Sequence, residues 1–104
     1  MEARIIDGDS FATPDGEIIR IENIDTPSIG DGARCTLERQ RSENTVARVK
    51  QLLSACPVEF ERRYRDRRGR TEARVSVCGQ DLGELLIKEG LATIRGDIDP
   101  PWCR

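Results

Sequence analysis

The sequence contains no histidine and few aromatic residues, which excludes an aromatic-rich core and a histidine-based active site. Only 4% of its 104 residues are aromatic, so any core must be built mainly from isoleucine, leucine and valine. Without histidine the chain lacks the usual general acid–base group and the commonest zinc ligand. Any catalytic base must therefore be a carboxylate, a lysine or a bound hydroxide ion.

Long hydrophobic runs are absent as well. No apolar stretch approaches the roughly 20 residues that cross a membrane, and no signal-peptide pattern opens the chain. We therefore expect a single domain without membrane association. The compartment is left open: the chain as given fits the cytoplasm, whereas a trimmed N-terminal signal would make it periplasmic or secreted.

The four cysteines form no CxxC pair and have no histidine partners, so a zinc site is not predicted. Cys56 and Cys78 lie near the far ends of a predicted hairpin, where we expect small core residues. Cys35 and Cys103 lie in loop-like segments and could form a disulfide if the protein is exported.

The charge is unevenly distributed. Residues 61–74 hold seven arginines against three acidic residues, a local charge of +4 in a chain whose net charge is −2. Such a patch can meet a phosphate backbone even on an acidic protein. The same arginines would equally suit the solvated surface of a hairpin.

Apolar alternation and turn residues predict a mainly β, α+β domain with the order three strands, helix, two strands, helix. The expected strands cover Ala3–Ile6, Phe11–Ala12, Ile18–Ile24, Val58–Tyr64 and Ala73–Val77, and the expected helices cover Ser42–Ser54, with Ser42 as N-cap, and Asp81–Glu89. Residues 28–34 are predicted to form a loop. The order favours a small barrel over residues 1–96 with an irregular tail over 97–104.

Two acidic clusters carry the chemistry. Asp7-Gly8-Asp9-Ser10 and Asp25-Thr26-Pro27 are separated by Arg20 and followed by Asp66-Arg67-Arg68-Gly69-Arg70. Close carboxylates hold a hard divalent cation and arginines clamp a phosphate, so the set indicates metal-assisted phosphoryl chemistry on a polyanion. The simpler alternative is structural: the first two aspartates form a turn, and the arginines pair with nearby acids such as Glu22, Asp66 or Glu72.

These residues resemble the staphylococcal nuclease family, also called thermonuclease-like domains. The resemblance runs in order from about Arg4 to Ala92, through Ile6-Asp7-Gly8-Asp9-Ser10-Phe11, Arg20-Ile21, Ile24-Asp25-Thr26-Pro27, Asp66-x-x-Gly69-Arg70 with Ala73, and Gly79 followed by Gly90-Leu91-Ala92. It implies a five-stranded OB-fold barrel with two or three helices packed against it.

The resemblance also implies roles for individual residues. The calcium-binding acids of the family correspond to Asp9 and Asp25, with Thr26 adding a backbone carbonyl. The two phosphate-contacting arginines correspond to Arg20 and Arg70. So few protein ligands should bind calcium weakly until the substrate supplies its own oxygens. Asp7 matches the first acid of the family's DGD motif and is expected to play a supporting role.

Two positions depart from the family pattern. The glutamate usually assigned to activate the attacking water falls at Ser28, whose neutral hydroxyl cannot act as the base but could hold a water. The tyrosine commonly found before the Gly-Arg pair is Arg68. Glu22 and Asp31 are nearby carboxylates that could substitute as a base, although neither is favoured.

Two functions follow from this pattern. The first is a calcium-dependent phosphodiesterase acting on DNA or RNA, a monomer slowed by the loss of the glutamate. The alternative is a catalytically impaired OB-fold module that binds single-stranded nucleic acid or an anionic partner. In either case, four arginines of the basic stretch are expected to contact nucleic acid: Arg62, Arg65, Arg67 and Arg68.

Overall fold

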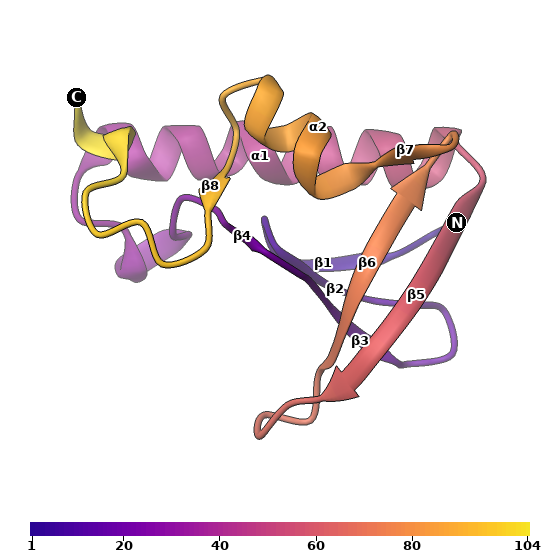
Figure 1. Cartoon of the computed structure of the whole chain (residues 1–104). Helices are drawn as coiled ribbons and strands as arrows, with labels where there is room; N and C mark the ends of the chain where they lie inside the picture. Colours follow the sequence, from indigo (N-terminus) through magenta and orange to yellow (C-terminus); the bar gives the residue numbers. More distant parts are fainter.

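The computed structural model describes residues 1–104 as a mixed α+β fold in which two helices pack beside an open sheet (Figure 1). The main sheet has the order β1-β2-β3-β6-β5, and only the β3–β6 pair is parallel. Its five strands are β1 (Arg4–Asp7), β2 (Ser10–Ala12), β3 (Ile18–Ile21), β5 (Val58–Arg65) and β6 (Thr71–Val77), and a short β7 (Gln80–Asp81) pairs with β6.

The predicted α+β class with a five-stranded OB-like sheet is confirmed. The edge strands β1 and β5 do not pair with each other, so hydrogen bonds do not close the sheet into a complete barrel. The core forms on the inner face, where the alternation of β3 places Ile19 and Ile21 against Phe11 and other fully buried apolar side chains. Arg20 lies on the opposite face, as the alternation predicts.

The third predicted strand is interrupted. After β3 the chain turns through Glu22 and Asn23, and it resumes as β4 (Ile24–Asp25), which pairs with β8 (Thr93–Ile94). Asn23 has a φ of 67°, in the left-handed region that asparagine tolerates better than β-branched residues. This break turns Asp25 away from the main sheet and toward the segment that follows β8.

The long helix α1 spans Thr36–Ala55, so the predicted start at Ser42 is wrong. The first six residues are mostly polar and carry little apolar periodicity, which hid the true start. The N-cap is Cys35, whose sulfur accepts a hydrogen bond from the backbone N–H of Glu38 at 3.3 Å. Ser42 is buried within the helix and donates to the Arg39 carbonyl at 2.6 Å.

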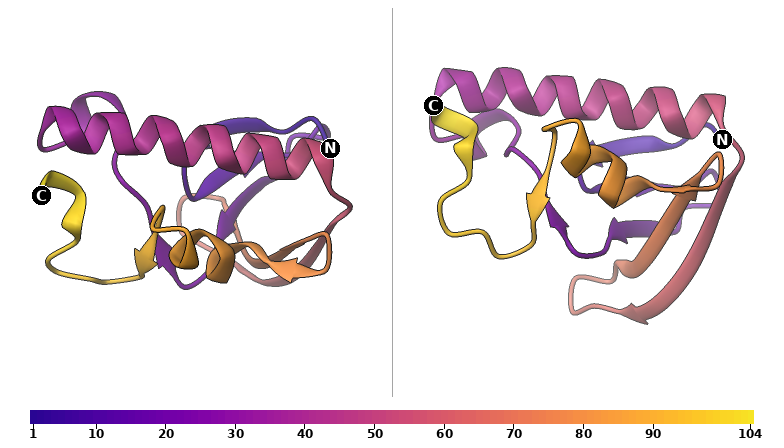
Figure 2. Two further views of the ribbon diagram at one scale, coloured as in Figure 1. Left: turned by 90° about the horizontal axis from the view of Figure 1, so that it is seen from above. Right: turned by 45° about the horizontal axis from the view of Figure 1, so that its top comes forward.

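The second helix, α2 (Leu82–Lys88), begins as the sequence predicts. Asp81 is its N-cap and accepts a hydrogen bond from the Glu84 backbone N–H at 2.9 Å. Figure 2 shows α1 running along the length of the molecule. α1 packs against β1, whereas the shorter α2 packs against β6. No helix combines the length and apolar character needed to span a bilayer.

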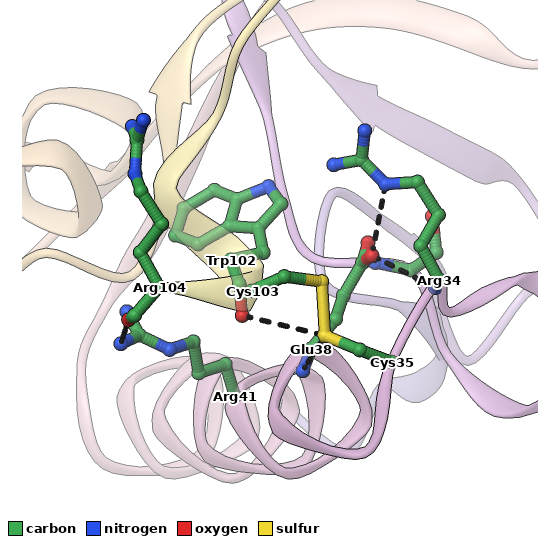
Figure 3. The surroundings of a disulfide bond; sticks show 8 residues. Arg34, Cys35, Glu38, Arg41, Trp102, Cys103 and Arg104 are labelled. Atoms are coloured by element: carbon green, nitrogen blue, oxygen red, sulfur yellow. Dashed lines mark hydrogen bonds and ion pairs between the residues drawn. A yellow bond between two sulfur atoms is a disulfide. The ribbon is translucent and has the colours of Figure 1, made fainter.

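All four cysteines are paired. Cys56 bonds to Cys78, so the expectation that these two are simply small core residues is wrong: they join the outer ends of the hairpin that brings their backbones together. Cys35 bonds to Cys103, the pairing considered from the sequence. The second bond ties the C-terminal segment to the start of α1 (Figure 3).

The remaining segments hold short 3-10 turns. One, η1 (Gly30–Gly32), lies in the predicted loop, and the other, η2 (Pro101–Cys103), lies in the segment predicted to be irregular. Trp102 of η2 is only 3% exposed. The C-terminal segment therefore packs against the fold beside the loop that carries Ser28.

Candidate active site

The first acidic cluster forms a tight connection between β1 and β2. Asp7 accepts hydrogen bonds from the Asp9 backbone N–H at 3.2 Å and from the Ser10 hydroxyl at 2.8 Å. A Cβ added at Gly8 would lie 2.7 Å from the Thr26 hydroxyl oxygen. Glycine is therefore what allows this connection to pack directly against the second acidic cluster.

Arg20 contacts both acidic clusters through Asp9 and Asp25. Its Nη2 atom lies 3.4 Å from an Asp9 carboxylate oxygen and 3.0 Å from an Asp25 oxygen, and it donates to the Ile24 carbonyl at 2.8 Å. Its Nη1 atom donates to the Ile21 carbonyl. The side chain is almost completely buried. Arg20 thus occupies the position of a cation between the two acids, and it does not pair with Glu22.

Arg70 approaches the same place from the turn between β5 and β6. Its Nε donates to Asp66 at 2.9 Å, while its Nη2 lies 3.9 Å from the buried carboxylate of Glu72. Asp66 also accepts from the backbone N–H groups of Arg68 and Arg70. Burial acts to raise the pKa of Asp66, but these hydrogen bonds outweigh it and lower that pKa to about 2. The pairing fixes the turn, and the Nη1 atom of Arg70 has no protein acceptor.

These side chains line one open groove of about 640 Å³. Asp9, Asp25, Arg20 and Arg70 all contribute to it, together with Asp7. An adjoining hollow of about 330 Å³ shares Asp9 and Asp25 and adds Thr26 and Ser28. The structure thus brings the sequence-predicted metal, arginine and Ser28 positions to one location.

The predicted nucleic-acid arginines divide into two groups. Arg67 and Arg68 line the groove, whereas Arg62 and Arg65 do not. Arg62 forms two hydrogen bonds to Glu17, at 2.8 and 2.6 Å, and its guanidinium lies over the Phe60 ring. In the β5–β6 ladder Arg62 and Arg65 lie opposite Ala73 and Thr71, whereas the groove residue Tyr64 lies opposite Glu72, so the two arginines project from the other face of the sheet.

The two alternative bases are not in the groove. Both Glu22 oxygens accept hydrogen bonds from Arg63, and Asp31 lies exposed in η1. Neither residue lines the groove or the adjoining hollow.

The environment of Asp9 disfavours the ionised form of its carboxyl group. Burial raises the pKa of Asp9 to about 7, assisted by the neighbouring Asp7 and opposed by Arg20. A buried carboxylate with such a pKa is incompletely neutralised by its surroundings. Asp9 therefore has a residual demand for positive charge that Arg20 alone does not meet.

Four neighbours of the candidate site were not predicted as site residues, and of these the sequence suggested only Glu72, as an acid that could pair with an arginine: Glu38, Glu72, Arg95 and Gly96. The Gly96 backbone N–H donates to Asp25 at 2.8 Å, opposite the Arg20 contact. Glu38 accepts a hydrogen bond from the Ser28 backbone N–H at 2.9 Å. It also accepts one from the Arg34 backbone N–H at 3.0 Å (Figure 3). Burial acts to raise the pKa of Glu38, and these hydrogen bonds lower it overall. The contact between Gly96 and Asp25, which are 71 residues apart, joins segments that only the fold brings together.

The donor set for a metal is small. No group of three or more histidine, cysteine, aspartate or glutamate side chains is arranged as a ready-made metal cage. What is present is a pair of carboxylates, on Asp9 and Asp25, turned toward one shared positive group, with Thr26 beside them. That set suits a hard cation with several open coordination positions better than it suits a closed structural site.

The model of the family described as staphylococcal nuclease homologue matches residues 18–101. The chain belongs to this family. The match includes both predicted phosphate arginines and Asp25, whereas Asp9 lies before it, so the place of Asp9 in the site rests on the structure. None of the curated proteins matches the chain. Membership in the staphylococcal nuclease family supports a nuclease-like or nucleic-acid-binding module.

Proposed function

We propose that the protein is a calcium-dependent phosphodiesterase of the staphylococcal nuclease type that hydrolyses DNA or RNA slowly. The observation that carries the proposal is the convergence of Asp9, Asp25, Arg20 and Arg70 on one groove. Asp9 lies in the β1–β2 connection, Arg20 in β3, Asp25 in β4 and Arg70 in the turn between β5 and β6. A purely structural use of the two acidic clusters would not require both arginines to meet them in an open groove.

Calcium would be held by the carboxylates of Asp9 and Asp25 and the carbonyl of Thr26, and when bound it would supply positive charge beside a phosphate oxygen. The fit is supported by the Arg20 guanidinium, which stands in for a cation between the two acids. The raised pKa of Asp9 supports it as well, because this buried carboxylate is not fully compensated by the positive charge around it.

The two arginines would play unequal parts. Arg70 keeps a free Nη1 group in the groove, so it can donate to a phosphate oxygen without giving up its Asp66 contact. Arg20 must release Asp9 or Asp25 before it can do the same. In phosphodiester hydrolysis negative charge accumulates on the equatorial oxygens, and guanidinium donors placed there lower the barrier.

Ser28 is the reason for a slow reaction. It lines the hollow beside Asp9 and Asp25, where a glutamate would accept the proton of an attacking water. Its hydroxyl stays neutral near pH 7, so that contribution, typically about 10²- to 10⁴-fold, is missing. Glu38 does not replace it, because both of its oxygens hold the loop and its pKa is lowered.

The alternative is a binding module that holds single-stranded nucleic acid or an anionic partner without cutting it. Ser28 favours this alternative, and so do Arg67 and Arg68, which line the groove without a carboxylate partner for their side chains. The lack of aromatic residues weighs against strong base stacking, since Tyr64 is the one aromatic residue of the groove.

One experiment separates the two functions. Labelled single-stranded DNA and RNA are incubated with calcium or with a chelator, using the natural protein, Arg70→Ala and Arg48→Ala. The last is a control, because Arg48 pairs with Glu89 on the helical side, away from the groove. The enzyme predicts calcium-dependent cleavage that falls about 10²- to 10³-fold in Arg70→Ala only. Salt-sensitive binding without cleavage supports the module and refutes the enzyme.

We also propose that the protein works in an oxidising compartment, because no cysteine is free and disulfides persist mainly in such compartments. Protein isolated from its natural host and alkylated without reduction should carry no label. Labelling of all four thiols would refute this proposal.

A further inference from the structure

One wall of the groove carries an aromatic ring beside a guanidinium. Tyr64 and Arg95 both line the groove, and Tyr64 is 59% exposed. In the β5–β6 ladder Tyr64 lies directly opposite Glu72. Residues paired in this way project from the same face of a sheet. Since Glu72 also binds Arg95, the ring and the guanidinium are neighbours on one wall.

Arg95 is held by one of its nitrogens. Its Nη1 donates to Glu72 at 2.7 Å, and Glu72 is only 2% exposed. The Arg95 side chain nevertheless remains 41% exposed. Its Nε and Nη2 atoms have no protein acceptor, so the outer edge of the guanidinium presents two parallel N–H groups. Anchoring by a buried carboxylate restricts the orientation of this edge, which makes it suitable for directional recognition.

We propose that Arg95 and Tyr64 form a guanine-selective position in the groove, with the base lying against the Tyr64 ring and its O6 and N7 atoms accepting from Arg95. This inference rests on the proposed function, because it concerns the nucleotide next to the phosphate that Arg70 contacts. Arg95 and Tyr64 would determine which base is preferred, and Glu72 is a positioning residue that orients Arg95.

Among the major-groove edges of the bases, the edge of guanine is the one that matches this donor pair. It displays two adjacent acceptors, O6 and N7, whereas adenine places a donor beside N7 and thymine offers a single carbonyl. A phosphate also offers two acceptors, so the experiment must separate the two. The aromatic ring favours the base, since a ring face stacks on a base and gives no attraction to a phosphate.

The test measures equilibrium binding of fluorescent hexanucleotides by anisotropy, with a chelator present so that no cleavage occurs. The probes are an all-thymine strand and matched strands with one guanine, one inosine or one 7-deazaguanine. The proteins are the natural chain, Arg95→Lys, Arg95→Ala and Arg74→Ala. Arg74 is a matched control, because it too is 41% exposed and paired with acids, but it lies outside the groove.

Guanine is expected to bind about 5- to 20-fold more tightly than thymine, with inosine like guanine and 7-deazaguanine like thymine. Arg95→Lys should remove this preference while leaving binding of the all-thymine strand within about twofold, because it keeps the charge but not the paired donors. Arg74→Ala should retain the preference.

Three results would overturn the inference. If all strands bind equally well to the natural protein, Arg95 does not read guanine. If Arg95→Ala weakens every strand by the same factor, Arg95 contacts a phosphate instead. If no strand binds at all, this inference fails, whereas the proposed function is tested separately by the cleavage assay with calcium.

Discussion

Replacing Ser28 by glutamate should restore a missing catalytic group. The Ser28 side chain is exposed, so a longer residue requires no new space in the core. Its backbone is held by the 2.9 Å hydrogen bond to Glu38, which keeps the loop beside Asp9 and Asp25. A carboxylate introduced here would point into the hollow that adjoins both acids.

The expected gain is about 10- to 1000-fold in kcat. General-base assistance is typically worth about 10²- to 10⁴-fold. We expect less than the upper value because an exposed glutamate is more mobile than a residue held by packing. It also adds negative charge next to Asp9, whose pKa is already raised, so the assay should use saturating calcium and a pH near 8.

The assay is cleavage of single-stranded DNA under single-turnover conditions, with thermal unfolding measured for each variant. Ser28→Gln is the control, since it adds the same bulk without a basic group and should not increase the rate. If Ser28→Glu is no faster than Ser28→Gln, while cleavage still depends on Arg70, then residue 28 does not face the reacting phosphate. That result would refute the assigned geometry.

Three further predictions follow from the same region. The folded-state pKa of Asp9 is raised to about 7, so its contribution to stability is fully present below its unfolded pKa and is lost as pH rises toward 7. Asp9→Asn should therefore raise the melting temperature by on the order of 5 °C at pH 8 and leave it unchanged at pH 4. Gly8→Ala should lower the free energy of unfolding, measured by chemical denaturation, by about 1–3 kcal/mol, because its methyl group would lie 2.7 Å from the Thr26 hydroxyl oxygen. It should also weaken calcium binding measured by calorimetry. Unchanged values would show that the two acidic clusters do not pack together. Removing the Cys35–Cys103 bond, which joins residues 68 positions apart, should lower the free energy of unfolding by about 4 kcal/mol in the same denaturation assay. A loss below about 1 kcal/mol would mean that packing alone holds the C-terminal segment.

The strand pattern could be predicted because it depends on local alternation. Isoleucine at positions 19 and 21 identified the buried face of β3, and the same alternation placed Arg20 on the other face. The beginning of α2 was also predictable, since the Asp81 cap acts within one turn. By contrast, the first turns of α1 are polar and are held by Cys35, whose disulfide partner is 68 residues away.

The strand alternation, the capping of α2 and the kinds of side chain available for chemistry can be predicted without coordinates, because each depends on residues close together in the chain or on residue type alone. The folded chain is needed to show that Arg20 is held between Asp9 and Asp25, that Gly96 binds Asp25, and that Arg95 is anchored to Glu72. Contacts between distant segments depend on how β4, β8 and the hairpin of β5 and β6 pack, and no local pattern records that packing.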